Sequence, residues 1–366
     1  MRIKLTGLLI IIFSFVAGII FSAEPKVEKK KEGTKERLKV GFVYVGPVGD
    51  AGWTYSHDVG RRAIEKKFPN VETKYIESVS EADVERVITN LAQKDFNLIF
   101  TTSFGFMDPT LKVAGKFPKT IFMHCSGYKT AKNMGNYFGR MYQGKYLSGI
   151  VAGKMTKTNK IGFIGPHAIP EVIRHIDAFT LGVRAVNSNA TVKVIWTGAW
   201  FDPTKEKEAA NSFFDAGCDI VATDADSVAP LQEAEKRGKY AIGYDSDSSH
   251  FAPKAFLTAP IWDWGIYYIK VIQEVLDGKF KPASDMWGME TGILKLAPFG
   301  PMVTDDVKKA VEEAKKKICS GEFKVFEGPI KNQKGELVLT KGQVMSDKDL
   351  LDINFFVEGI EGSIPK

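Results

Sequence analysis

The fold is decided by the stretch Lys39-Val-Gly-Phe-Val-Tyr-Val-Gly-Pro-Val-Gly-Asp-Ala-Gly-Trp-Thr-Tyr-Ser-His-Asp-Val-Gly60. It opens on a β-branched and aromatic run over 39–45, which is typical of a buried parallel strand. A glycine-rich loop follows, and glycine lets a backbone turn tightly or approach a ligand. A helical pattern over 53–68 comes next. Because ligands of open α/β sheets bind beyond the carboxyl ends of strands, this corner is a candidate site, with Trp53 at its centre.

The same strand–loop–helix unit recurs along the chain. We expect strands at 39–45, 71–76, 97–102, 120–124, 160–164, 191–196, 219–222, 240–243, 255–258 and 291–296, with short ones near 135–139, 323–327 and 336–340. We expect helices at 53–68, 81–94, 106–116, 142–155, 169–187, 204–216, 228–237, 264–276 and 304–319. Such alternation predicts parallel sheets covered by helices on both faces. A polar link at 156–160 divides it, so we predict an α/β fold of two doubly wound parallel-sheet lobes joined by a hinge.

Each lobe is expected to combine separate parts of the chain. We assign 38–157 plus about 262–283 to the N-terminal lobe, and 158–261 plus about 284–366 to the C-terminal lobe. Residues 1–23 have a basic start and an apolar run, which indicates a signal peptide or, near the roughly 18-residue limit for spanning, a retained anchor. Residues 24–37 form a charged linker. We therefore expect an exported protein, periplasmic or at the cell surface, that meets the membrane only through an uncleaved N-terminal segment.

The composition is that of a soluble globular protein, with 44% hydrophobic and 26% charged residues. The net charge of +6 lies partly in the N-terminal segments, so no nucleic-acid partner is expected. Cys125, Cys218 and Cys319 fit no zinc or Cys-x-x-Cys spacing, and the histidines have no metal-ligand spacing. We expect no cofactor, no metal and no catalytic residue, and the sequence does not require an enzyme.

Two acidic pairs, Asp224-x-Asp226 and Asp245-x-Asp247, each close a predicted strand. They could bind a metal in a secreted enzyme, cap helices and form turns, or accept hydrogen bonds from a ligand. We favour ligand binding for Asp226 and Asp245, and capping for at least one of the other two.

Aromatic residues gather at predicted strand ends in both lobes. Trp53, Trp200 and Trp262 lie just beyond strands, and Phe104 belongs to the similar stretch Thr102-Ser-Phe-Gly-Phe106. One tryptophan alone is more often a core residue than a ligand contact. Several at strand exits of facing lobes predict a cleft with aromatic walls, where a flat ring gains about 1–3 kcal/mol per stacked base.

The chain resembles the basic membrane protein (BMP) family of solute-binding proteins, which includes purine-nucleoside receptors of ABC importers. The resemblance runs from Leu38 to about Gly328. It rests on these stretches: Asp50-Ala-Gly-Trp53-Thr54, Ser103-Phe-Gly-Phe106, Tyr146-Leu-Ser-Gly-Ile-Val-Ala-Gly153, Lys157-Thr-Asn-Lys-Ile-Gly-Phe-Ile-Gly165 with Ile169-Pro170, Trp200-Phe-Asp-Pro203 and Gly243-Tyr-Asp-Ser-Asp247.

The resemblance implies a type I periplasmic-binding-protein fold that closes on a ligand and presents both lobes to ABC permease subunits. It implies that Trp53 and Trp200 sandwich a purine and that Asp245 binds near the ribose position. With the residues at the predicted strand ends, this gives the candidate ligand-binding set: Trp53, Trp200, Asp245, Asp226, Phe104, Ser103, Trp262, Tyr44, Trp264 and Asp50.

Three positions depart from the family pattern. An acid of the family is Tyr44 here, another is replaced within His124-Cys-Ser-Gly127, and a lysine aligns with Trp262. Because an indole and a phenol suit ribose hydroxyls less well than an ammonium and a carboxylate, we expect a free base such as adenine to bind better than a nucleoside. A nucleoside, a flavin-like solute and a sugar-like solute remain alternatives on the same fold, and a metal-dependent enzyme using the acidic pairs remains a less favoured one.

Overall fold

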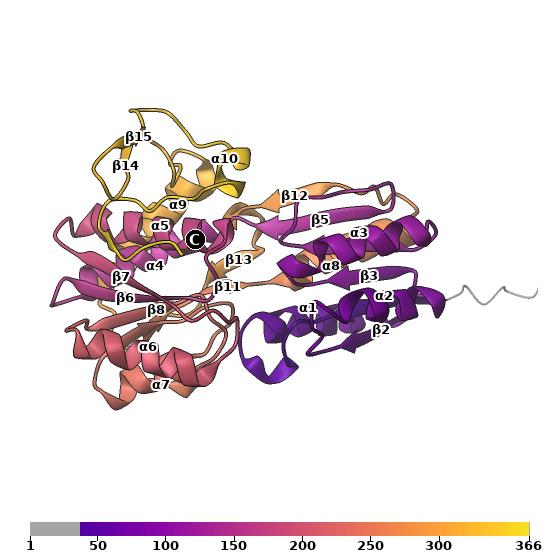
Figure 1. Ribbon diagram of the computed structural model, residues 1–366, viewed down its shortest axis with the longest axis horizontal. Helices are drawn as coiled ribbons and strands as arrows, with labels where there is room; N and C mark the ends of the chain where they lie inside the picture. Colours follow the sequence, from indigo (N-terminus) through magenta and orange to yellow (C-terminus); the bar gives the residue numbers. More distant parts are fainter. Residues whose placement is uncertain (1–36, 366) are drawn as a thin grey trace, which may run out of the picture. The chain divides into compact units, whose positions relative to one another are not determined.

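The structure is a computed structural model that describes residues 37–365, so the predictions made for residues 1–36 lie outside the described part (Figure 1). Its first sheet is parallel throughout, in the order β12-β5-β4-β3-β1-β2. The strands are β1 (Leu38–Val43), β2 (Val71–Ile76), β3 (Leu98–Thr101), β4 (Ile121–Cys125), β5 (Met134–Gly139) and β12 (Ser284–Trp287). The buried run over β1 therefore forms the inner strand that its sequence predicts.

Helices cover this sheet and pack closely on one another. They are α1 (Trp53–Lys67), α2 (Val84–Gln93), α3 (Met107–Lys116) and α8 (Trp264–Leu276). Where α1 meets α8, a Cβ placed on Gly60 would lie 2.9 Å from the Trp264 Cβ and from the Tyr268 ring. Gly60 therefore lets the two helix backbones approach, and it brings the first turn of α8 beside the middle of α1.

The second sheet is also parallel, in the order β10-β9-β8-β6-β7-β16. Its strands are β6 (Lys160–Gly165), β7 (Thr191–Trp196), β8 (Ile220–Thr223), β9 (Tyr240–Ile242), β10 (Phe256–Thr258) and β16 (Ile360–Glu361), and its helices are α4 (Met141–Met155), α5 (Pro170–Val186), α6 (Pro203–Asp215) and α7 (Ala229–Lys236). Glycines set the α4–α5 crossing: a Cβ on Gly149 or Gly182 would lie 2.1 or 2.0 Å from a carbonyl oxygen of the facing helix. The small residues of the Tyr146–Gly153 motif thus have a packing role.

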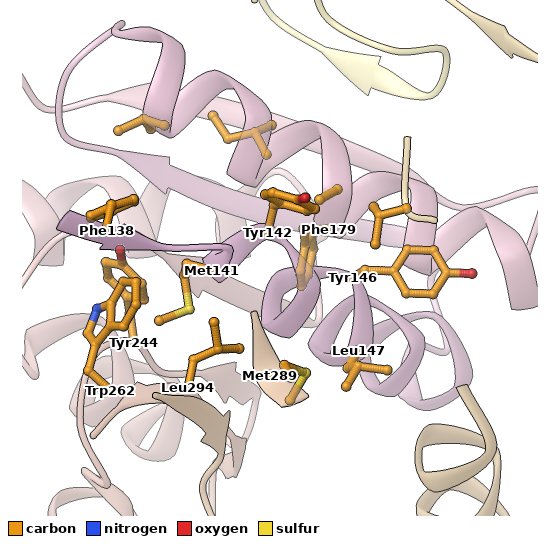
Figure 2. Close-up of a cluster of buried hydrophobic side chains, with 14 of the residues drawn as sticks. Phe138, Met141, Tyr142, Tyr146, Leu147, Phe179, Tyr244, Trp262, Met289 and Leu294 are labelled. Carbon is orange, nitrogen blue, oxygen red and sulfur yellow. The ribbon is translucent and has the colours of Figure 1, made fainter. Parts of the chain in front are cut away.

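The chain passes between the lobes near residues 139–141, 258–264 and 287–294. Within the last two passages, β11 (Pro260–Trp262) pairs antiparallel with β13 (Leu294–Leu296), and Figure 1 shows this small ribbon between the two sheets. Figure 2 shows the buried side chains around it, from Phe138, Tyr244 and Trp262 at one end to Leu147 on α4 at the other. The hinge is therefore well packed, and it is continuous with the cores of both lobes.

The C-terminal segment follows α9 (Asp305–Ser320) and comprises β14 (Ile330–Lys331), β15 (Leu337–Leu339), α10 (Asp347–Leu351) and β16. It packs over α4 and α5, in yellow in Figure 1, and its last strand extends the second sheet beside β7.

The predicted alternation of strands and helices in two parallel-sheet lobes is confirmed. β12 pairs with β5, so the sheet of the first lobe extends to Trp287, past the boundary expected at about 283. Two local strand predictions were wrong. Residues 323–327 form no strand, and the strand expected at 291–296 begins only at Leu294, after a 3₁₀ turn over 289–291. Such short elements are fixed by partners far along the chain rather than by local sequence pattern. Among residues 37–365, we find no helix long and apolar enough to cross a bilayer.

Candidate functional site

A small cavity, with about 30 Å³ free inside it, lies between the lobes, beyond the carboxyl ends of both sheets. Its lining residues come from both halves of the chain: Val45, Trp53, Ser103, Phe104, Ser126, Glu171, Trp200, Asp224, Asp226, Tyr244 and Asp245. Two tryptophans and a phenylalanine supply flat apolar surfaces, and four carboxyl groups supply polar ones. Ligands of doubly wound sheets bind at this kind of place, so the cavity is the candidate binding site.

Trp53 forms the wall from the first lobe. Its indole Nε1–H donates to the backbone oxygen of Thr102, 2.6 Å away, which fixes the direction of the ring. Edge-on contacts with His57 and Trp264, at ring-centroid distances of 4.3 and 5.6 Å, support the ring from behind. The wall is therefore held in place by the lobe before any ligand arrives, which lowers the entropy cost of stacking.

Trp200 contributes from the second lobe, in the loop after β7. Its ring contacts His167 at a centroid distance of 5.1 Å and, like Trp53, is partly buried against the core, with fewer aromatic neighbours than Trp53 among the described residues. Its backbone oxygen accepts a 2.9 Å hydrogen bond from the Asp226 N–H. The same loop thus positions an aromatic wall and one of the cavity acids.

The two lobes touch directly beside the cavity. The Trp53 N–H donates to Asp226 Oδ1 at 3.3 Å, and the Ser246 hydroxyl donates to the Ala51 backbone oxygen. Gly52 lies at the tightest point, because a Cβ there would be 2.8 Å from the Asp226 backbone oxygen. The structure therefore has the lobes closed on one another at the loop before α1.

Asp224 is neutralised within the protein. Lys145, buried on α4, makes an ion pair with Asp224 Oδ1 and donates to the Thr223 backbone oxygen at 3.0 Å. His175 Nδ1 lies 2.9 Å from Asp224 Oδ2. Burial lowers the pKa of His175 to about 4, so at neutral pH it is an uncharged donor. Lys145 and His175 together lower the pKa of Asp224 despite its burial.

Asp226 and Asp245 are close enough to share a hydrogen bond. Unlike Asp224, neither of them forms an ion pair with a cationic side chain of the described chain. Asp245 Oδ1 accepts from the indole Nε1–H of Trp262 at 2.7 Å, while its Oδ2 is buried and no N–H of the described chain reaches it. Burial raises the pKa of each of these carboxyl groups well above its usual range. A donor-rich ligand would satisfy them.

Glu171 lies in the first turn of α5, where the cavity meets an outer chamber. Burial raises its pKa to about 7, with the Asp224 charge acting in the same direction and Arg174 opposing. The outer chamber, about 370 Å³, shares Phe104, Ser126 and Glu171 with the inner cavity. Lys348, Leu351 and Asp352 complete its wall, so the C-terminal segment reaches the mouth of the site.

Two of the expected ligand-binding residues lie away from the cavity. Tyr44 is fully buried, and its ring stacks on that of Tyr75 at 5.7 Å inside the first lobe. Asp50 accepts backbone N–H groups of Gly52, Thr54 and Tyr55 at 2.8–2.9 Å, so it holds the loop and the start of α1. Asp is favoured in such capping positions, and that signal was present in the sequence.

The expected residues Trp262 and Trp264 also stand behind the cavity wall. Their rings stack on one another at 4.3 Å, and Trp264 is fully buried. Trp262 acts on the site through its hydrogen bond to Asp245 and its edge contact with Trp53. Both are therefore supports of the site in this structure rather than lining residues.

The expected residues Trp53, Ser103, Phe104, Trp200, Asp226 and Asp245 line the cavity together. Sequence reasoning missed Val45, Ser126, Tyr244 and Glu171. The first three follow strands directly, so strand-end position could have indicated them. Glu171 lies at a helix start and had no such signal.

The acidic pairs do not converge as a metal site would. Asp224 already has the Lys145 ammonium on it, and Asp247 Oδ1 accepts the Ser249 N–H at 3.1 Å in a turn. In the described part of the chain, no group of three His, Cys, Asp or Glu side chains has metal-binding geometry.

Comparison with known proteins agrees with this architecture. The family described as "ABC transporter substrate-binding protein PnrA-like" matches residues 37–327. A purine-binding protein of Brucella abortus is 46% identical over 97% of this chain and 100% of its own. A Haloferax volcanii protein, provisionally named an ABC transporter glucose-binding protein, is 38% identical over 90% of this chain and 82% of its own.

Solved structures show the same fold at low identity. A solute-binding protein of an ABC transporter system from Aeropyrum pernix superposes with a TM-score of 0.69 at 19% identity, covering 87% of this chain and 98% of its own. One from Conexibacter woesei gives 0.67 at 21%, covering 78% and 98%. With the family match over residues 37–327, the chain belongs to the PnrA-like (BMP) family of ABC transporter substrate-binding proteins.

Proposed function

We propose that this protein captures a purine-type ligand, preferably a free base such as adenine, outside the cytoplasmic membrane and delivers it to the permease of an ABC importer. The observation that carries the proposal is the cavity itself, with Trp53 and Trp200 from opposite lobes and acids at the edge between them. Indole faces suit a flat heterocycle, and buried acids suit its N–H groups. The most similar relative described above carries a purine-binding name.

The size of the cavity supports a base over a nucleoside. Only about 30 Å³ is free between the closed lobes, so the lining would have to move less for a bare base than for a base with a ribose attached. A ribose would have to extend into the outer chamber, whose inner edge is formed by Phe104, Ser126 and Glu171. The preference for a base no longer rests on Tyr44 and Trp262 as apolar walls of the site. Tyr44 is buried inside its lobe, and Trp262 acts on the site through its hydrogen bond to Asp245.

A sugar is the second candidate, because the Haloferax relative is named for glucose. Aromatic faces and carboxylates also bind sugars, and this cavity offers both. Against it, a hexose has hydroxyl groups on every edge, whereas apolar and aromatic surface lines much of this cavity. Hydroxyls buried there without partners would cost roughly 1–3 kcal/mol each.

Calorimetric titration with adenine, adenosine, guanine, guanosine and glucose tests the proposal. We expect adenine to bind most tightly. Nucleosides that bind more tightly than their bases would contradict the preference for a free base. Binding of glucose without binding of any purine would replace the purine proposal with the sugar one. Mass spectrometry of the small molecule that co-purifies is an independent check.

We infer that binding occurs without turnover, because the cavity carboxyls serve as hydrogen-bonding groups and Asp224 is already paired. Adenine incubated with the protein should be recovered unchanged by chromatography. Deamination that disappears in Asp226→Ala would show an enzyme instead.

Replacing Trp200 with Ala should weaken adenine binding by about 1–3 kcal/mol and should change unfolding less than the loss of Trp53, because Trp200 has fewer aromatic neighbours. Trp53→Ala should weaken binding similarly and also reduce stability by roughly 2–3 kcal/mol, since it loses the Thr102 bond and its packing. Trp196→Ala is the control, because this ring packs on Phe356 away from the cavity. Unchanged affinity in both cavity variants would reject the sandwich.

Replacing Gly52 with Ala should weaken adenine binding by roughly 1–3 kcal/mol, because its Cβ would press on the Asp226 backbone when the lobes close. The separated lobes tolerate the methyl group, so thermal unfolding without ligand should change little. Gly49→Ala is the matched control, because its Cβ would have no atom within 4 Å. If both variants bind adenine equally well, closure does not pass through this contact.

A further inference from the structure

We propose that Asp226 and Asp245 share one proton and bind the ligand as an acid–carboxylate pair, with Asp226 the neutral member and Asp245 the charged one. The inference rests on the proposed purine function and specifies the ligand class: a heterocycle whose edge carries an exocyclic N–H donor beside a ring-nitrogen acceptor.

The hydrogen-bond partners of the two carboxyls are unequal. Asp245 lies in the loop after β9, where its backbone has a positive φ of 64°. Its carboxyl accepts a hydrogen bond from the Trp262 indole N–H at 2.7 Å. Asp226 accepts only the longer 3.3 Å bond from the Trp53 backbone N–H. A stronger donor stabilises the charged form of a carboxyl, so charge is favoured on Asp245.

The surrounding charges point the same way. The charge of Lys145, which lies against Asp224 and the Tyr244 ring, lowers the pKa of Asp245 and so opposes the effect of its burial. Asp226 faces Asp50 and Glu206 as well as Asp245, and these like charges add to burial in raising its pKa. Two buried carboxyls in contact cannot both ionise at low cost. The titratable groups facing the pair from every side are Asp50, Lys145, Glu171, Glu206, Asp224 and Tyr244.

The pair can therefore donate a hydrogen bond to a ligand as well as accept one. With the shared proton on Asp226, its hydroxyl can donate to Asp245, and the buried Oδ2 of Asp245, which no N–H of the described chain reaches, can accept. An exocyclic amine can donate to Asp245, while the Asp226 hydroxyl can turn to a ring nitrogen. Adenine presents this donor–acceptor edge. Two ionised carboxylates would instead demand a ligand with donors alone.

Adenine affinities of four proteins test the inference: the parent, Asp226→Asn, Asp226→Ala and Asp245→Asn. Asparagine keeps a donor and an acceptor without charge, so Asp226→Asn should bind within about threefold of the parent. Asp226→Ala and Asp245→Asn should each bind at least about tenfold more weakly, as expected for a lost hydrogen bond to a polar or charged group. Unsubstituted purine, which lacks the amine, should bind the parent at least about tenfold more weakly than adenine.

Two results would overturn the inference: Asp226→Asn as weak as Asp226→Ala, or Asp245→Asn as strong as the parent. Infrared difference spectroscopy reads the proton directly and does not need the Asp245 variant to fold. The C=O stretch of one protonated carboxyl should disappear in Asp226→Asn at neutral pH, and its absence from the parent contradicts the pairing. If adenine fails to bind the parent at all, the purine proposal fails, while the infrared result still decides the shared proton.

Discussion

A chain that ends at Glu327 should not fold. The segment beyond it is outside the family match, yet it inserts a set of side chains into the main core: Ile330, Leu339, Leu350, Ile353, Phe356, Val357 and Ile360, each at most 6% exposed. Each buried side chain of this kind contributes about 1.5–3 kcal/mol. Together they contribute about 10–20 kcal/mol, which is as large as the roughly 5–15 kcal/mol by which native proteins are stable. Expression followed by circular dichroism and gel filtration would show an unfolded or aggregated product.

Polar groups would be exposed or orphaned as well. The buried Asp177 carboxylate on α5 accepts the Val357 N–H at 2.9 Å, and β7 would lose its edge partner β16. Two milder variants serve as controls. Removing only residues 363–366 loses the Trp196–Ser363 bond and the partly buried side chain of Ile364, and should cost about 1–3 kcal/mol. Asp347→Ala breaks the exposed ion pair with Arg140 and should cost up to about 1 kcal/mol. A chain ending at Glu327 that folds cooperatively would show that the C-terminal segment is an appendage.

The central fold could be predicted because its signals are local. The inner strands β1 and β6, for example, are largely apolar runs of six residues, each followed by a loop and an amphipathic helix. The missed strands carry no such signal. β12 has the sequence Ser-Asp-Met-Trp, and it is a strand because the edge of β5 is available to it.

The site could be predicted only in part, because strand-end position brings a residue near the cleft without deciding where its side chain points. Trp53 and Trp200 line the cavity, whereas Tyr44, at the end of β1, turns into its own lobe. Whether such a side chain faces the cavity or its own lobe depends on how the neighbouring side chains pack, and the strand pattern does not show that packing. Trp262 and Trp264 pack on each other, and no single-strand pattern shows that pairing.

The charged residues behind the site were the hardest to predict. Lys145 sits in Tyr142-Gln-Gly-Lys-Tyr-Leu, and a lysine between aromatic residues is usually read as surface. It is buried because β8 delivers Asp224 to it from the next part of the chain. Burial of a lysine needs such a partner, which lies 79 residues away and is visible only in the folded protein.

This pairing makes Lys145 the most consequential side chain on α4. Its ammonium contacts Asp224 and lies 3.6 Å from the centroid of the Tyr244 ring, which itself lines the cavity. Burial lowers the pKa of Lys145, and the Asp224 charge opposes that shift. The charged pair is therefore sustained by mutual neutralisation, and either partner alone would be a buried charge.

Lys145→Met should reduce the free energy of unfolding by about 3–5 kcal/mol, because Asp224 then keeps only the neutral His175 as a partner. The double variant Lys145→Met with Asp224→Asn should be more stable than the single one, since the orphaned charge is gone. Lys154→Met is the matched control on the same helix: its ion pair with Asp306, at 3.6 Å, is exposed and should be worth at most about 1 kcal/mol. Urea unfolding of the four proteins gives the comparison. If Lys145→Met and Lys154→Met are equally stable, Asp224 must accept a proton or a water molecule at little cost once Lys145 is gone. The buried ion pair would then contribute little to the stability of the second lobe.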